Sequence, residues 1–116
     1  MTALLVAIGA AVGAPVRLLV NHALRVQCGA TPMAGTLTVN VVGSFLLGLL
    51  AGWGVHGNSL ALVGVGFCGA LTTFSTLALE IWEAFDEGPR RLALINVVAS
   101  LTLGVGAAAL GWSLVA

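Results

Sequence analysis

The sequence predicts an all-α membrane protein with four transmembrane helices, the third of which is broken at mid-membrane. Of its 116 residues, 59% are hydrophobic and 7% are charged, and the mean hydropathy is +1.13. These values lie far outside the composition of soluble globular domains. A cluster of Thr and Ser residues interrupts the third apolar segment, which indicates the break.

Four apolar segments account for nearly the whole chain, so we expect a single transmembrane domain over residues 1–116. Because a span needs about 20 apolar residues, we predict helices at Thr2–Leu24, Ala34–Val55, Ser59–Trp82 and Arg90–Val115. The first segment has neither a basic N-terminal region nor a convincing cleavage site, which disfavours a signal peptide.

The predicted first helix places Gly9, Gly13, Arg17, Asn21 and Arg25 on one face, because they recur at intervals of four. Glycines allow close approach of helices, so this face is expected to pack against protein. Arg17 lies well inside the span, where a charge costs roughly 2.5–3.5 kcal/mol unless it snorkels or finds partners. We assign it a structural or vestibule role.

The second and fourth helices repeat this spacing, each with a polar half and a small-residue half. The positions are Thr36, Asn40, Ser44, Gly48 and Gly52 in the second helix, and Asn96, Ser100, Gly104 and Ala108 in the fourth. Ser and Thr in membrane helices commonly bond across helices, but an amide is costlier to bury. Asn40 is therefore predicted to be functional, whereas Asn96 fits either a functional or a packing role.

The predicted break lies at Gly69–Thr76, which reads Gly-Ala-Leu-Thr-Thr-Phe-Ser-Thr. Irregular polar backbone at bilayer depth is tolerated only where it is buried in protein or lines a watery path. We therefore place the functional centre of the protein here, as a site that binds or moves an ion near the membrane midplane.

The polar groups available to that ion are mostly neutral donors. Apart from Glu80, the inner positions lack carboxylates, which leaves a polyvalent cation or a proton relay without ligands. Amide and hydroxyl hydrogens and the positive ring edge of Phe74 suit an anion, and each is weak enough to release it. Glu80, at the end of the third helix, is grouped with Arg17 and Asn96 as a vestibule or structural residue.

Other classes of function find little support in the sequence. The formal net charge is zero, so no basic patch indicates nucleic-acid binding. No nucleophile and base pair, metal cluster or phosphate loop indicates an enzyme. Cys28 and Cys68 stand outside any Cys/His cluster and are interpreted as structural thiols.

Three motifs in order resemble the Fluc, or CrcB, family of bacterial fluoride channels, and the resemblance covers essentially the whole chain. They are Gly9-x-x-x-Gly13-x-x-x-Arg17, Gly35-Thr-Leu-Thr-Val-Asn40-Val-Val-Gly43-Ser-Phe and Gly66-Phe-Cys-Gly69-Ala-Leu-Thr72-Thr-Phe74-Ser-Thr76. The resemblance implies an antiparallel, dual-topology dimer in the bacterial plasma (inner) membrane. Two pores along the subunit seam would export fluoride passively and so relieve its toxicity.

The resemblance also implies particular residues. A structural Na⁺ at the dimer centre would be held by backbone carbonyls of Gly69 and Thr72 from both subunits, which gives the broken helix a physical purpose. In the pore, Asn40 would donate to fluoride and Phe74 would present its ring edge. Ser100 would line the path, with Ser75 and Thr76 as further candidates.

One position departs from the family pattern. A second phenylalanine usually follows the first by three residues, and here that position is Leu77. Moreover, the loops near Arg25 and Arg90–Arg91 hold three arginines on one side of the membrane, while the other side has none. Because cytoplasmic loops collect Lys and Arg, we expect this chain to pair with an oppositely oriented paralogue, with a homodimer as the alternative.

Two alternative functions remain at this stage. The chain could be a non-conducting or one-pore partner subunit of a heterodimeric fluoride channel, since Leu77 replaces a pore residue. A small multidrug exporter has similar length and four spans, but it needs a carboxylate in its first helix. Met1–Leu24 contains none, so this alternative is remote.

Overall fold

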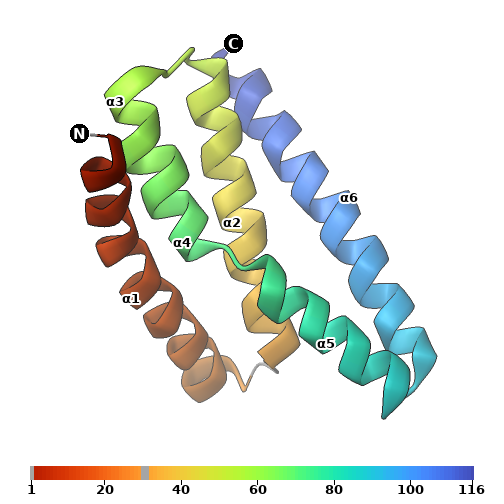
Figure 1. Ribbon diagram of the computed structural model, residues 1–116. Coiled ribbons are helices and arrows are strands. Elements are labelled where there is room, and N and C mark those ends of the chain that lie inside the picture. The colour runs from red at the N-terminus through yellow and green to blue at the C-terminus, as the bar shows by residue number, and fades with distance from the viewer. Residues whose placement is uncertain (1, 30–31) are drawn as a thin grey trace.

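Four helical spans form a bundle in the computed structural model, which describes residues 2–29 and 32–116 (Figure 1). Each is long and apolar enough to cross a membrane, which confirms the predicted fold class. The elements are α1 (Thr2–Cys28), α2 (Pro32–Gly52), α3 (Gly57–Ser59), the π-helical segment η1 (Leu60–Cys68), α4 (Gly69–Leu71), α5 (Phe74–Asp86) and α6 (Arg90–Val115).

The observed bounds differ from the predicted spans mainly at the ends of the first three helices. α1 continues past Leu24 to Cys28, and α2 ends at Gly52 rather than Val55. The third span runs over residues 57–86 and is longer at both ends than predicted. The fourth, α6, has the predicted bounds.

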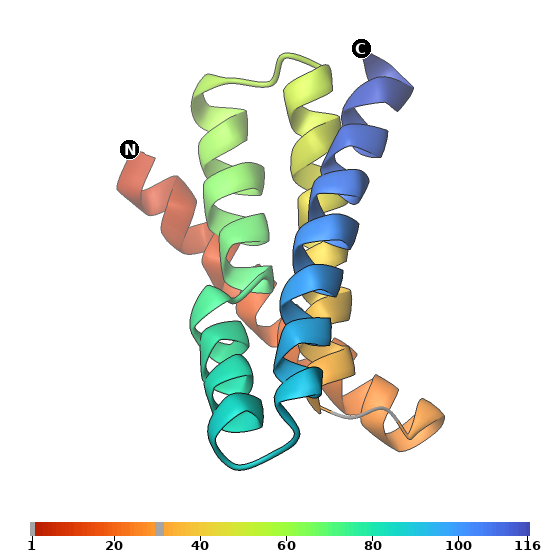
Figure 2. The ribbon, with the colours of Figure 1, turned by 90° about the vertical axis from the view of Figure 1, so that its right-hand side faces the viewer.

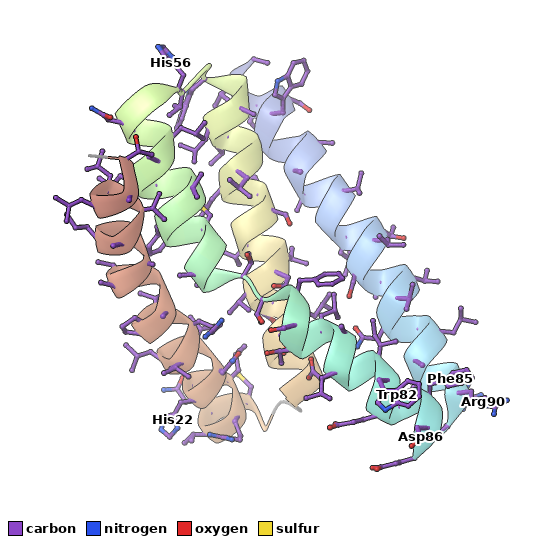
Figure 3. All side chains as sticks on the ribbon, in the orientation of Figure 1. His22, His56, Trp82, Phe85, Asp86 and Arg90 are labelled. Atoms are coloured by element: carbon purple, nitrogen blue, oxygen red, sulfur yellow. The ribbon has the colours of Figure 1, made fainter. Side chains whose placement is uncertain are left out.

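Both termini and the connection from α2 to α3 lie at one end of the bundle, and the turn between α5 and α6 lies at the other (Figure 1). His22 and His56 mark these opposite ends (Figure 3). The four basic and four acidic residues all fall within residues 17–25 and 80–91, toward the end with the α5–α6 turn. Charge is therefore concentrated in one half of the membrane protein.

Glycines bring α1 into close contact with the first half of the third span. A Cβ atom on Gly9 would overlap the carbonyl oxygen of Leu62, and one on Gly13 would overlap that of Phe67. From the other side, a Cβ on Gly66 would lie 2.6 Å from the carbonyl oxygen of Val6. Small residues on both helices thus allow backbone contact, as is typical of helix pairs in membranes.

α2 and α6 pack along each other and run in the same direction (Figure 1). Gly48 lies against the backbone of Ala108, and one turn earlier Gly104 lies near Ser44. The four-residue spacing of both sequences therefore forms a single interface. The same register brings Asn40 level with Ser100.

We expect Gly48→Ala to destabilise the protein by about 1–3 kcal/mol, the usual cost of overpacking. The added methyl group would overlap the Ala108 carbonyl oxygen, which belongs to a rigid helix backbone. Gly106→Ala is the matched control, because no heavy atom lies within 4 Å of its added Cβ. Thermal unfolding in detergent measures both, and equal midpoints would contradict this account of the interface.

The third span packs against different helices before and after the break. Before it, η1 and α4 pack against α1; after it, α5 packs against α6. Figure 2 shows α5 continuing beyond the break alongside the first part of α6. The segment before the break is π-helical rather than α-helical over Leu60–Cys68, which the sequence pattern did not predict.

The turn between α5 and α6 is closed by local bonds. The backbone N–H of Glu87 donates to the carbonyl of Glu83 at 2.8 Å, and that of Leu92 donates to the carbonyl of Pro89 at 2.9 Å. The Arg90 guanidinium lies 4.6 Å from the centre of the Phe85 ring (Figure 3). This geometry is a cation–π contact, and it ties the start of α6 to the end of α5.

Candidate functional site

The helix break is confined to two threonines. Thr72 (φ −83°, ψ 160°) and Thr73 (φ −149°, ψ 116°) are extended, while the flanking residues of α4 and α5 are helical. The irregular backbone is therefore shorter than the predicted stretch of residues 69–76. Gly69 itself is right-handed helical, with φ −63° and ψ −36°, a conformation that every residue type adopts.

Asn40 on α2 binds the extended backbone of the break through both ends of its amide. The backbone N–H of Thr73 donates to Asn40 Oδ1 at 2.8 Å, and Asn40 Nδ2 donates to the Thr73 carbonyl at 3.2 Å. A primary amide carries two N–H donors, so one N–H of Asn40 remains for another partner. The residue is half-buried.

Thr73 also caps the N-terminus of α5. Its Oγ1 accepts the backbone N–H of Thr76 at 3.3 Å and donates to the Thr76 hydroxyl at 3.1 Å, and it lies 3.4 Å from the hydroxyl of Ser75. A Thr N-cap satisfies one of the amides that a helix start leaves unpaired. The two predicted polar residues Ser75 and Thr76 are thus gathered around Thr73 and are exposed in the single chain.

These bonds divert two backbone donors from their usual acceptors. In a continuous α-helix the N–H of Thr73 would donate to Gly69, and that of Thr76 would donate to Thr72. Here Asn40 Oδ1 and Thr73 Oγ1 take those hydrogens instead. The carbonyls of Gly69 and Thr72 are consequently freed from these helical bonds.

A cavity of about 210 Å³ lies at the break between α2 and α5. Its lining combines polar groups of both helices with apolar side chains: Asn40, Ser44, Leu47, Thr72, Thr73, Phe74 and Leu77. The Phe74 ring is 82% exposed in the single chain, so much of its surface is available to another molecule. The structure therefore brings together two predicted pore residues, Asn40 and Phe74.

Leu77 takes part in two surfaces. Besides the cavity, it lines an apolar groove of about 340 Å³ on α5, together with Phe74, Trp82 and Phe85. At the place of the second aromatic ring of the family pattern, this chain thus presents an aliphatic side chain. It offers no ring edge to an anion there.

A second polar cluster lies deeper in the bundle, where α2, α5 and α6 meet. Thr36 and Asn96 are 2% and 3% exposed, and Ser100 donates to Asn96 Oδ1 at 3.2 Å. Glu80 is half-buried and within hydrogen-bonding reach of Thr36. Within the described residues, Asn96 Nδ2 and Glu80 Oε1 are buried without a hydrogen-bond partner. One carboxylate oxygen of Glu80 is therefore shielded from solvent within the bundle.

The remaining predicted residues lie apart from the cavity. Arg17 is half-buried on α1, the helix that packs against η1 and α4. Ser100 bonds to Asn96 and does not line the cavity. Gly69 is exposed, and the nearest heavy atom to an added Cβ is the Gly64 carbonyl oxygen at 4.0 Å.

Thr73 and Thr36 are the residues whose importance the sequence analysis missed. Thr73 had a detectable signal, since a Thr before a helical segment at a break is a typical N-cap. Thr36 was placed on the correct face of α2, but its proximity to Glu80 depends on how α5 packs after the break. A single sequence does not report that packing.

The relationship to known proteins is clear over most of the chain. Residues 4–112 match the family described as "CrcB-like protein, Camphor Resistance (CrcB)". The chain is 43% identical to Fluoride-specific ion channel FluC 1 of Frankia casuarinae, over 98% of this chain and 95% of the relative. It is 47% identical to FluC 1 of Nocardia farcinica (89% and 72%) and 42% identical to FluC 2 of Haloarcula marismortui (96% and 91%). This multi-pass membrane protein belongs to the CrcB family.

Proposed function

We propose that this protein is a fluoride-selective channel that conducts the ion passively and has no enzymatic activity. The observation that carries the proposal is the cavity at the helix break, where neutral donors converge beside an exposed aromatic ring. Relatives that cover nearly the whole chain are named fluoride-specific ion channels. Passive export of cytoplasmic fluoride across the bacterial plasma membrane relieves fluoride toxicity.

The geometry suggests how the anion is held. One N–H of Asn40 is engaged by the Thr73 carbonyl, and the second donates to fluoride. The positive edge of Phe74 supplies a second contact. Fluoride is small and tightly hydrated, so a narrow path of such donors replaces its water, whereas larger anions fit poorly.

Polar residues outside the cavity extend the proposed path of the fluoride ion. Ser75 and Thr76 continue it along the start of α5, and Ser100 lies on α6 level with Asn40. We assign the cluster of Thr36, Glu80 and Asn96 a structural role beside the path, because Thr36 and Asn96 are almost fully buried. Among the described residues, Asn96 Nδ2 has no hydrogen-bond partner. Arg17 contributes positive charge or structure at the same half of the membrane.

The functional unit in this proposal is an antiparallel dimer. Support comes from the residues that follow the break, because the Phe74 ring, Ser75 and Thr76 are exposed in the single chain. Exposed backbone irregularities and hydroxyls are costly against lipid, so a second subunit covers them. The two pores then run along the seam between subunits.

A central Na⁺ ion completes the dimer in this proposal, held by the carbonyls of Gly69 and Thr72 from both subunits. The residues fit such an ion, because the donors that would occupy these carbonyls in a continuous helix are bound by Asn40 and Thr73. Carbonyl oxygens are suitable ligands for a hard cation. The ion supplies positive charge that holds two partially negative backbone segments together.

The partner subunit is an oppositely oriented paralogue in our proposal, with the same chain as the alternative. Arg25 lies in the last turn of α1, and Arg90 and Arg91 begin α6, at the same end of the bundle. The described residues at the other end include no Lys or Arg, and this bias favours one orientation. A partner with a phenylalanine at the position of Leu77 would restore the missing ring edge. The partner also decides whether this subunit contributes one pore or two.

Fluoride efflux from liposomes that contain only this protein tests the proposal. We expect fluoride efflux that is low with this chain alone and rises when an oppositely oriented paralogue is added. A matched chloride-loaded sample should show no chloride efflux. Equal fluoride and chloride flux would contradict selectivity, and full fluoride flux from this chain alone would contradict obligatory pairing.

A further inference from the structure

Two side chains at the break accept hydrogen bonds from backbone N–H groups that would donate to carbonyls in a continuous helix. Asn40 Oδ1 accepts the N–H of Thr73 at 2.8 Å, and Thr73 Oγ1 accepts the N–H of Thr76 at 3.3 Å. The acceptors displaced by these bonds are the carbonyls of Gly69 and Thr72, which are the two backbone ligands of the proposed cation. The two diverted bonds and the two proposed ligands thus correspond one to one.

We propose that Asn40 and Thr73 are positioning residues for the central cation site, because they hold the break open and keep both carbonyls available. This inference rests on the proposed Na⁺ ion. Neither side chain touches the ion. Their action is to give the two backbone N–H groups an acceptor, without which those groups would return to the helical carbonyls or remain unsatisfied at bilayer depth.

Asn40 then has two tasks in one side chain. Its Oδ1 and one Nδ2 hydrogen fix the Thr73 peptide group, while its remaining N–H lies at the cavity that holds the anion. The pore wall and the cation site are therefore connected through one amide. If Asn40 acted only as a donor to the anion, replacing it would leave Na⁺ affinity unchanged. Experiments can therefore separate the two roles.

Aspartate and leucine substitutions at Asn40 separate its two roles. Asn40→Asp keeps an oxygen that accepts the Thr73 N–H, but its second oxygen would face the Thr73 carbonyl instead of donating to it, and it adds negative charge. It should therefore abolish fluoride flux and retain cation binding only in part. Asn40→Leu removes acceptor and donor at similar size, so it should lose both. Thr73→Val removes the cap of α5, whereas Thr73→Ser retains it.

The cation response is measured as the rise in thermal unfolding midpoint of the purified protein with increasing NaCl, against N-methylglucamine chloride at equal ionic strength. We expect Asn40→Leu and Thr73→Val to raise the half-saturating Na⁺ concentration by about 10- to 100-fold, the loss typical of removing a partner that orients a metal ligand. Thr73→Ser should stay close to the unmodified protein, and Asn40→Asp should fall between the unmodified protein and Asn40→Leu. Thr38→Val is the control on α2, because the bond that the Thr38 hydroxyl makes among the described residues lies within its own helix, to the Ala34 carbonyl at 2.8 Å.

The outcomes distinguish this inference from the proposed function. An unchanged Na⁺ response in folded Asn40→Leu and Thr73→Val would overturn it, as would a lost response in Thr73→Ser. If Asn40→Leu does not fold, the Thr73 pair decides. Absence of any Na⁺ response in the unmodified protein would remove the cation site and this inference together, while fluoride flux in liposomes would leave the channel function standing.

Discussion

Replacing Asn40 with aspartate is expected to abolish fluoride efflux, although the two side chains have nearly the same shape. The aspartate cannot donate to an anion, and its charge repels one at the position where Asn40 would donate in the proposed pore. Two unit charges 4 Å apart at an effective dielectric constant near 20 interact by roughly 4 kcal/mol, which lowers anion occupancy about a thousandfold. Asn40→Ala removes the donor without adding charge and should also stop efflux.

The measurement is fluoride efflux from liposomes at equal protein density, with dimer content checked by cross-linking. Thr38→Val serves as the control, because Thr38 lies on the same helix and, within residues 2–29 and 32–116, its hydroxyl bonds to the Ala34 carbonyl and not to the break. It should conduct like the unmodified protein. Undiminished efflux through a correctly assembled Asn40→Asp dimer would exclude Asn40 from the pore.

Gly69→Val is expected to remove the cation site while leaving the fold of the single chain intact. Gly69 is helical, and the nearest heavy atom to an added Cβ lies 4.0 Å away, so neither backbone conformation nor internal packing requires glycine here. In our proposal the need for a small residue comes from outside the single chain. A branched side chain would obstruct the partner subunit or the ion that the exposed Gly69 faces in the proposed dimer.

The expected loss is the whole Na⁺-dependent stabilisation, which is about 2.7 kcal/mol at a Na⁺ concentration one hundred times the dissociation constant. Thr72→Ser should retain it, because the carbonyl is unchanged and a hydroxyl can still donate to Cys68 as Thr72 does at 2.9 Å. Side-chain ligation by Thr72 would instead make that position sensitive. A Gly69→Val dimer with a normal Na⁺ response would disprove the assignment.

Most of the fold could be predicted from the sequence, because its determinants are local or periodic. Apolar segments of sufficient length specify four spans in any bilayer. The four-residue spacing of Gly48 and Gly104 with their neighbours indicates which faces pack, and the structure places those faces together. The cluster of threonines marks the break within a few residues, and the three sequence motifs identify the family.

Only the tertiary structure decided what the side chains at the break bind. The sequence predicts that Asn40 is functional, but its bonds to Thr73 join residues 33 positions apart, and no local pattern encodes such a contact. The same holds for Glu80, which approaches Thr36 because the third span leaves α1 at the break and continues as α5 against α6. Composition and periodicity fix which groups enter the membrane and on which face they lie. The direction of the chain after the break, which depends on packing between distant helices, determines which of these groups meet.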